Sequence, residues 1–217
     1  MLKNFAYDTV LWDWNGTLLD DLGASLSSVN DMLARRDMTP ISVEQYYEYI
    51  DTPIIKFYEH LFPVSPESFD AVAKEFQKGY ALHSDPPVLH EGALEVLEEL
   101  KNSGVRQYIV SSAQKRQILE LLDRFNIASY FEAVLAAEDR LAESKVERTK
   151  KYFLERGIEH SCSLMVGDTL HDLHTADALS ADCLLLTKGH QSREILESGG
   201  GKTIDSLYDI YKRKVNA

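Results

Sequence analysis

The stretch Tyr7-Asp8-Thr9-Val10-Leu11-Trp12-Asp13-Trp14-Asn15-Gly16-Thr17 decides the fold of this chain of 217 residues. Residues 7–12 are rich in β-branched and aromatic side chains, which favours a short buried strand. The Asn15-Gly16 dipeptide is a turn signal, so we expect a tight turn directly after the strand. Asp13 therefore lies at the carboxyl end of a predicted strand.

The segment that follows, residues 19–89, has helical patterns throughout. Its first apolar residues, Leu22, Leu26, Val29 and Leu33, recur at a helical spacing. Prolines separate the later pieces, and Asp85-Pro86-Pro87 closes the segment. Further helices are predicted near residues 42–50, 53–62 and 66–83.

From residue 90 onward, predicted strands and helices alternate. Helices are expected at 91–102, 114–125, 145–156 and 170–179, with a last one near 204–213. Strands are expected at 105–110, 131–135, 164–166 and 182–186. Such alternation predicts a parallel sheet with helices on both faces and right-handed crossovers. The expected fold class is α/β, a doubly wound parallel sheet formed by residues 1–18 and 90–217, with a helical cap inserted at 19–89.

The composition is that of an ordinary globular protein, with 44% apolar and 27% charged residues. The 23 basic and 35 acidic residues give a net charge of −12, which disfavours nucleic acid and anionic membranes as partners. No apolar run approaches the roughly 18 residues of a membrane helix. Two cysteines, Cys162 and Cys183, are too few for a disulfide framework, and we expect both thiols to be buried. A cytoplasmic location is predicted. The sequence does not predict an oligomeric state.

Polar residues follow the predicted strands at the edge where open parallel sheets bind ligands. Asp13 follows the first strand, Ser111-Ser112 the second, and Asp168 and Asp172 the strand at 164–166, while Lys145 begins a helix. Each alone would be an ordinary helix cap or surface charge. Together, the three carboxylates suit a hard divalent cation, of which Mg²⁺ is expected, and the hydroxyl and ammonium groups suit a phosphate. The set is typical of phosphoryl transfer.

These residues resemble the motifs of the haloacid dehalogenase superfamily. Asp13-Trp14-Asn15-Gly16-Thr17-Leu18-Leu19-Asp20 is similar to its first motif and Ile109-Val110-Ser111-Ser112 to its second. Lys145 fits the third motif, and Gly167-Asp168 through Asp172 matches the fourth. The insert at 19–89 stands where the family carries its C1 cap. Among the subgroups, the chain looks most like the phosphoglycolate phosphatase and β-phosphoglucomutase type.

The resemblance implies a Rossmann-like core and a role for each residue. Asp13 would be the nucleophile that forms an aspartyl-phosphate, and Lys145 would orient it. Ser111, together with Ser112 and Lys145, would bind the phosphoryl group of a small phosphorylated metabolite. The cap would close over the site, exclude water and select the substrate.

The resemblance also implies a Mg²⁺ site and exposes one departure from the family. Asp13, the backbone carbonyl of Asn15 and Asp168 would bind the ion, with help from Asp172. The family's phosphatases have a second aspartate where this chain has Asn15. That aspartate protonates the leaving oxygen and later activates water, and an amide can do neither. A positioned acid or base contributes about 10²–10⁴ in rate.

Several interpretations of Asn15 stay open. The enzyme would act on substrates with good leaving groups, or another residue would supply the proton, with Asp20, Asp21, His60 and His83 as candidates. Alternatively, the chain is a weakened scaffold that binds a phosphorylated ligand without turnover. A further alternative is a carbon–phosphorus hydrolase. Lys56 of the insert could imitate the Schiff-base lysine of such enzymes, but a surface lysine is the better interpretation.

Two other patterns suggest chemistry less strongly. Gly199-Gly200-Gly201-Lys202-Thr203 resembles a phosphate-binding loop, but Leu196 stands where that motif needs its first glycine, so we expect a loop. His171 and His174 lie three residues apart, as transition-metal ligands can. Because they lie on the first turn of a predicted helix, we interpret them as polar surface residues. His190 follows the last predicted strand and is assigned no role.

Overall fold

The computed structural model describes residues 5–51, 53–138, 144–159 and 162–211. Within them, six strands form one parallel sheet in the order β3-β2-β1-β4-β5-β6. The strands are β1 (Thr9–Trp12), β2 (Arg106–Gln114), β3 (Ala133–Ala137), β4 (Ser163–Gly167), β5 (Asp182–Leu186) and β6 (Thr203–Ile204). The predicted doubly wound parallel sheet is confirmed. Its strand order reverses between β1 and β4, so a ligand is expected beyond the carboxyl ends of these two strands.

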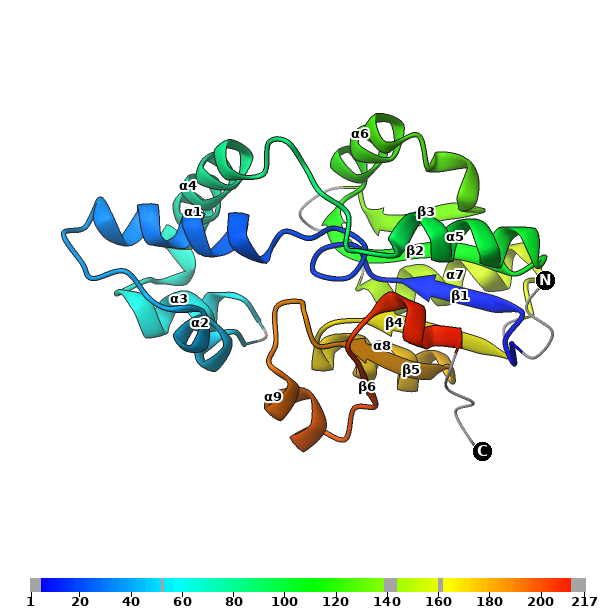
Figure 1. Ribbon diagram of the computed structural model, residues 1–217. Coiled ribbons are helices and arrows are strands. Elements are labelled where there is room, and N and C mark those ends of the chain that lie inside the picture. The colour runs from blue at the N-terminus through cyan, green and yellow to red at the C-terminus, as the bar shows by residue number, and fades with distance from the viewer. Residues whose placement is uncertain (1–4, 52, 139–143, 160–161, 212–217) are drawn as a thin grey trace.

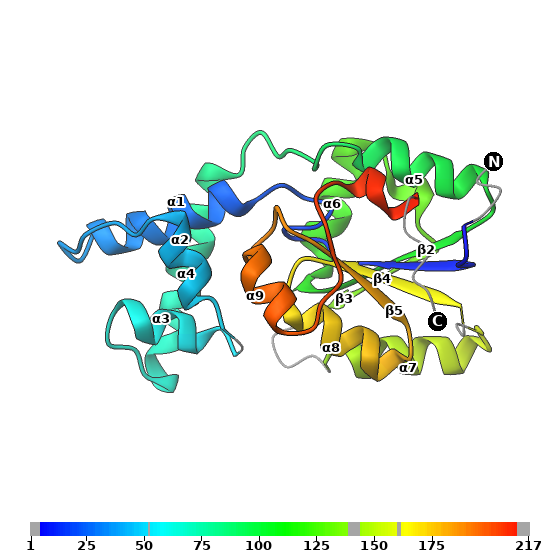
Figure 2. The same cartoon turned by 60° about the horizontal axis from the view of Figure 1, so that its bottom comes forward.

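Helices cover both faces of the sheet, as Figure 2 shows. One face carries α5 (Ala93–Asn102), α6 (Lys115–Phe125) and the 3-10 helix η2 (Leu207–Tyr211). The other carries α7 (Lys145–Arg156), α8 (Leu170–Leu179) and α9 (Arg193–Ser198). Along β1, Val10 and Trp12 pack into the first apolar core and Leu11 into the second. Because successive side chains of a strand point to opposite faces, β1 has to be apolar throughout.

Four helices lie between β1 and α5 in the chain and extend beyond the sheet (Figure 1). They are α1 (Leu22–Ala34), α2 (Val43–Tyr49), α3 (Ile55–Leu61) and α4 (Pro66–His83). They share an apolar cluster of their own, which includes Val29, Met32 and Phe57. In this cluster α1 packs along α4, where the Ser28 hydroxyl donates to the Phe76 carbonyl at 2.7 Å. The helical prediction for this segment is confirmed, and the domain boundaries at 19 and 89 stay a prediction.

The two connections between the helices and the sheet run side by side. The Asp20 N–H donates to the Val88 carbonyl and the His90 N–H to the Leu18 carbonyl, each at 2.9 Å, and Leu19 forms an antiparallel bridge with Leu89. The insert therefore leaves and re-enters the core at one place, next to the loop that follows β1.

The C-terminal part differs from the sequence prediction. Instead of a helix near 204–213, the chain forms β6 and then η2, and residues 212–217 lie outside the described part. Thr203 and Ile204 are buried and pair with β5, which requires an extended backbone there. The short helix α9 and β6 were not predicted, because six and two residues are too few to show a periodicity.

Two smaller expectations also need correction. β2 does not end before Ser111-Ser112 but continues through both serines to Gln114, with a register irregularity after Val110. Cys183 is buried, as predicted, but Cys162 is exposed, because it lies in a turn before β4 begins. Among the described residues, no helix combines the length and the apolar character needed to cross a membrane.

Candidate active site

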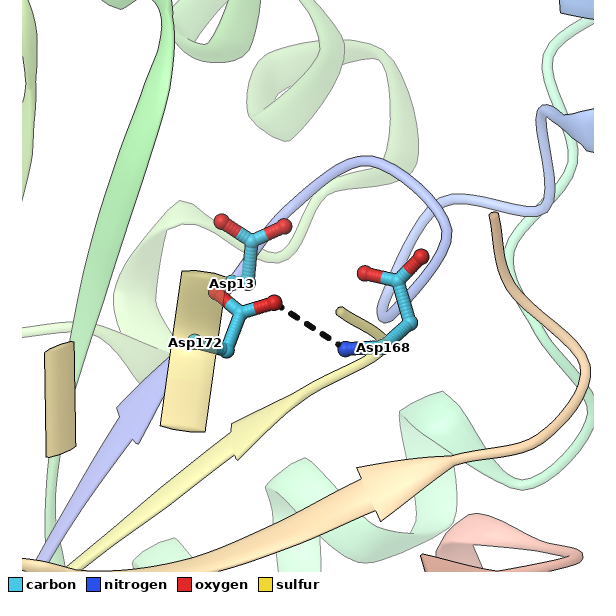
Figure 3. A group of neighbouring side chains, drawn as sticks. All are labelled: Asp13, Asp168 and Asp172. Atoms are coloured by element: carbon cyan, nitrogen blue, oxygen red, sulfur yellow. Dashed lines mark hydrogen bonds between the residues drawn. The ribbon is translucent and has the colours of Figure 1, made fainter. Parts of the chain in front are cut away.

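Three carboxylates meet at the carboxyl ends of β1 and β4 (Figure 3). Asp13 follows β1, Asp168 follows β4, and Asp172 lies in the first turn of α8. One carboxylate oxygen from each lies within 4.8 Å of the other two, and all three residues are buried. The Asp13 N–H donates to the Val166 carbonyl at 2.8 Å, which fixes the end of β1 against β4. Three buried oxygen donors suit a hard divalent cation such as Mg²⁺.

Hydrogen bonds fix the orientation of the second and third carboxylates. Asp168 accepts from the Thr17 hydroxyl at 3.0 Å and from the His190 N–H at 2.7 Å. Asp172 accepts through Oδ2 from the N–H of Asp168 at 3.2 Å and from the N–H and hydroxyl of Thr169 at 3.0 and 2.7 Å. Asp172 therefore holds the turn between β4 and α8, and its remaining oxygen, Oδ1, faces Lys145.

Lys145, the first residue of α7, places its ammonium between two of the carboxylates. Nζ lies 3.4 Å from Asp13 Oδ1 and also bonds to Asp172 Oδ1. The lysine side chain is only 3% exposed, so the ammonium is stable there because of these two anions. Its positive charge offsets part of the negative charge of Asp13 and Asp172.

The pKa values of the three aspartates differ because their partners differ. Burial and the neighbouring Asp172 raise the pKa of Asp13 well above its usual range. Burial raises the pKa of Asp168 to about 6. Burial acts the same way on Asp172, but Lys145 and the hydrogen bonds from Thr169 outweigh it and leave that pKa below its ordinary value. This crowding of buried carboxylates would be relieved by a divalent cation.

Gly16 allows the loop after β1 to approach the carboxylates. Its φ is +70°, a left-handed conformation that favours glycine. A Cβ there would lie 2.2 Å from Oδ2 of Asp168 and 2.6 Å from Cδ2 of His190. The Asn15-Gly16 turn predicted from the sequence thus has both a conformational and a steric reason.

The side chain of Asn15 bonds to residues of the helical insert and its connection. Its Nδ2 donates to Asp21 Oδ2 at 2.7 Å and to the Tyr80 hydroxyl at 3.3 Å. Asp21, which is buried, also accepts from the Gly16 N–H at 2.7 Å and from the Tyr80 hydroxyl at 2.8 Å. Asp21 is therefore the one of the four candidate proton donors that contacts Asn15.

His190 extends this network from the loop after β5. Its Nε2 lies 3.2 Å from Asp21 Oδ1, and its Nδ1 lies 3.0 Å from the hydroxyl of Tyr46 in α2. Burial alone would lower the pKa of His190, but Asp21 outweighs it and raises this pKa to about 9. The contact with the Asp21 carboxylate thus favours the protonated form of the imidazole. The sequence pattern assigned His190 no role, because its partners lie 169 and 144 residues away.

The two predicted phosphate-binding serines differ in environment. Ser111 is 2% exposed and lies in β2, two residues beyond Ile109, which pairs with Trp12. Ser112, the next residue, is exposed. Ser111 is thus the serine whose place beside the end of β1 suits a phosphoryl ligand.

The remaining candidates are exposed, partly exposed or bonded to other residues. Asp20 is exposed, His60 stacks on Tyr49, and His83 pairs with Asp31 at 2.9 Å on the surface. Lys56 is 48% exposed and forms an ion pair with Asp51 at 3.3 Å, which does not suit a Schiff-base lysine. Among the described residues, His171 and His174 belong to no cluster that would hold a metal ion.

Residues 10–186 match the family described as haloacid dehalogenase-like hydrolases. The chain therefore belongs to this family, as its motifs indicated. The family match, the parallel sheet and the acidic cluster agree with one another.

Individual relatives carry more specific names. The chain is 27% identical to phosphoglycolate phosphatase 1 of Pseudomonas aeruginosa over 93% of this chain and 77% of the relative. It is also 27% identical to a phosphoglycolate phosphatase of Pseudomonas fluorescens, over 91% and 76%.

Solved structures show the same fold. A protein of Clostridium acetobutylicum described as a predicted phosphatase superposes with a TM-score of 0.80 at 20% identity, over 95% of this chain and 97% of the other. Protein tyrosine kinase A of Mycobacterium tuberculosis superposes with a TM-score of 0.78 at 19% identity, over 96% and 98%. Because these two names differ in activity, the fold alone does not fix the reaction.

Proposed function

We propose that this chain is a Mg²⁺-dependent phosphatase that hydrolyses a small phosphorylated metabolite through an aspartyl-phosphate on Asp13. The observation that carries the proposal is the buried group Asp13, Asp168 and Asp172 with Lys145 beside it. The phosphatase names of the relatives support the same class of reaction. The substrate class we favour is a small phosphorylated metabolite, in agreement with the names of these relatives.

The carboxylates fit a Mg²⁺ ion, because the ion prefers oxygen ligands and a partly solvated site. Asp13, Asp168 and the backbone carbonyl of Asn15 would hold it, and Asp172 would support the site through the hydrogen bond that it accepts from the Asp168 N–H. When bound, the ion would neutralise charge on the transferring phosphoryl group.

In the first step, a carboxylate oxygen of Asp13 attacks phosphorus, and the bond from phosphorus to the leaving oxygen breaks. Lys145 holds Asp13 in position, and Ser111 binds an oxygen of the phosphoryl group. In the second step, water attacks the aspartyl-phosphate, which releases phosphate and restores the Asp13 carboxylate. Charge neutralisation and positioning supply most of the rate in such reactions.

Asn15 affects which substrates react. Its amide cannot give a proton to the leaving oxygen, so substrates with good leaving groups, such as acyl or aryl phosphates, should react fastest. A second candidate function follows from the same observation, namely a protein that binds a phosphorylated ligand with little turnover. The exposed Lys56 gives no support to a carbon–phosphorus hydrolase.

The test is phosphate release with MgCl₂ from p-nitrophenyl phosphate, acetyl phosphate, phosphoglycolate and sugar phosphates. The proposal expects turnover that Asp13→Asn abolishes. If Asp13→Asn keeps full activity, the nucleophile assignment is wrong. If no substrate reacts but phosphoglycolate raises the melting temperature, the binding protein is the better description. The cytoplasmic location stays a prediction.

A further inference from the structure

Asp21 stands where a helix cap is expected, yet its side chain does not cap α1. It occupies the N-cap position of that helix and makes no side-chain bond to the helix backbone. Aspartate is a favoured N-cap residue because its carboxylate can accept from free N–H groups of the first turn. Here the carboxylate points instead to the loop after β1, where it accepts from Asn15 and Gly16.

Four donors surround the Asp21 carboxylate. Besides Asn15 and Gly16, they are the hydroxyl of Tyr80 and the imidazole of His190. A carboxylate has about four acceptor positions, so its capacity is used. The side chain of Asp21 is 3% exposed, and these donors therefore replace water as its solvation.

The carboxylate also decides how the Asn15 amide is turned. An ionised carboxylate can only accept, so the amide must present Nδ2 to Asp21. Nδ2 also lies 3.3 Å from the Tyr80 hydroxyl, on the same side as Asp21. Because Nδ2 is turned toward Asp21 and Tyr80, the oxygen Oδ1 at the other end of the amide is the atom that Asn15 turns away from them.

We propose that Asp21 is a positioning residue, which fixes Asn15 as a hydrogen-bond acceptor in the active site. The inference rests on the phosphatase function proposed above and deepens it. Residue 15 then takes no proton. It accepts a hydrogen bond from the attacking water while the new oxygen–phosphorus bond forms and the bond from phosphorus to Asp13 breaks. Both hydrogens of the water leave with the released phosphate, so the step balances without a protein base. A side-chain amide can orient water in other phosphoryl transfers.

The same contacts connect this orientation to the helical insert. Tyr80 comes from α4 and Tyr46, which bonds to His190, comes from α2. Asn15, Gly16 and His190 belong to the sheet and its loops. The Asn15 amide is therefore fully held only while the helices lie against the core, so that cap position and water orientation are coupled.

The test exchanges the side chains of Asn15 and Asp21. We would measure kcat and KM for p-nitrophenyl phosphate with MgCl₂ in Asp21→Asn, Asn15→Asp and the double variant that carries both changes. Asp21→Asn frees the amide to rotate, so kcat should fall about 10- to 100-fold while KM changes by less than about threefold, the size expected for misplacement of a reacting group.

Asn15→Asp alone places two carboxylates where a 2.7 Å hydrogen bond now joins an amide and a carboxylate, so it should also lose activity. The double variant restores one amide and one carboxylate with their places exchanged. Its kcat should exceed the value expected from multiplying the two single effects by at least about 10-fold, the size of a coupling of 1.4 kcal/mol between contacting residues.

Asp70→Asn is the matched control, since it removes a carboxylate that pairs with Lys74 on the surface of α4, the helix that carries Tyr80. Its kcat should stay within about twofold of the wild type, as expected for an exposed ion pair. If Asp21→Asn does not fold, Tyr80→Phe replaces it, because this change removes one donor to Asp21 and one acceptor for Asn15. Tyr80→Phe should also lower kcat.

The outcomes separate the two proposals. A wild-type kcat in Asp21→Asn or in Tyr80→Phe, or single effects that simply multiply, overturns the role of Asp21 and leaves the phosphatase assignment intact. No phosphate release by the wild type, or full activity in Asp13→Asn, overturns the phosphatase assignment and this inference together.

Discussion

Replacing Lys145 with methionine tests whether the carboxylate cluster depends on its ammonium group. The lysine side chain is 3% exposed, and it contacts Asp13, 12% exposed, and Asp172, 1% exposed. Methionine keeps an unbranched side chain of similar length and removes the charge. The variant therefore leaves two buried carboxylates without their cation while changing the packing little.

The size of the effect follows from burial. Removing one partner of a buried ion pair typically costs about 3–5 kcal/mol, because the remaining charge stays buried. For a chain of this length each kcal/mol lowers the melting temperature by roughly 2–4 °C, so a fall of about 6–20 °C is expected. Lys74→Met is the matched control. It removes a lysine whose 2.7 Å pair with Asp70 is 60% and 54% exposed, and such pairs contribute at most about 1 kcal/mol.

The assay is urea denaturation at neutral pH in EDTA and again in MgCl₂. The free energy of unfolding should fall far more in Lys145→Met than in Lys74→Met, and Mg²⁺ should recover more stability in the first variant, since a bound cation stabilises the folded state. Equal losses in the two variants, or a loss below about 1 kcal/mol for Lys145→Met, would refute the view that the ammonium compensates the cluster.

Three further predictions concern the same site. Ser111→Ala should lower kcat/KM for phosphate release by about 10- to 100-fold, because a hydrogen bond to a charged group is worth about 1.5–3 kcal/mol; an unchanged value contradicts phosphate binding by Ser111. In EDTA, the raised Asp168 pKa of about 6 means that the protonated form stabilises the fold below pH 4, and that this contribution is lost as the pH rises to 6. In urea titrations, the free energy of unfolding of Asp168→Asn should not show that loss. A pH profile identical to that of the wild type would contradict the raised pKa of Asp168. Gly16→Ala should reduce Mg²⁺-dependent turnover by at least about 10-fold, since its Cβ would lie 2.2 Å from Asp168; normal kinetics would show that the loop can move aside.

The sheet and the cluster of polar residues could be predicted because their signals are local. β1 is a run of β-branched and aromatic residues, and Asp13, Asp168 and Lys145 each stand at the end of a strand or the start of a helix. In a parallel sheet, such ends meet at one edge. Family motifs then suggested roles for these residues, which stay proposals for this chain.

The network around Asn15 could not be predicted in the same way. Its members Tyr46, Tyr80 and His190 lie far apart in the chain and carry no spacing that distinguishes them from packing residues. Asp21 was one of four candidates, and only the fold shows that it turns away from its helix toward the loop. Short elements such as β6 were missed because tertiary pairing, and not periodicity, makes them.

The paired connections at Leu18–Asp20 and Val88–His90 have a consequence for how this chain could be modified. These hydrogen bonds hold the two crossing points together. For the stability of the sheet, the intervening helices therefore act as one closed loop. The entropy of closing a loop grows only with the logarithm of its length, about 0.6 kcal/mol for each doubling. Grafting a longer or shorter insert between these points should therefore cost the sheet little stability, which makes this junction a suitable place for exchanging the insert with segments from other proteins.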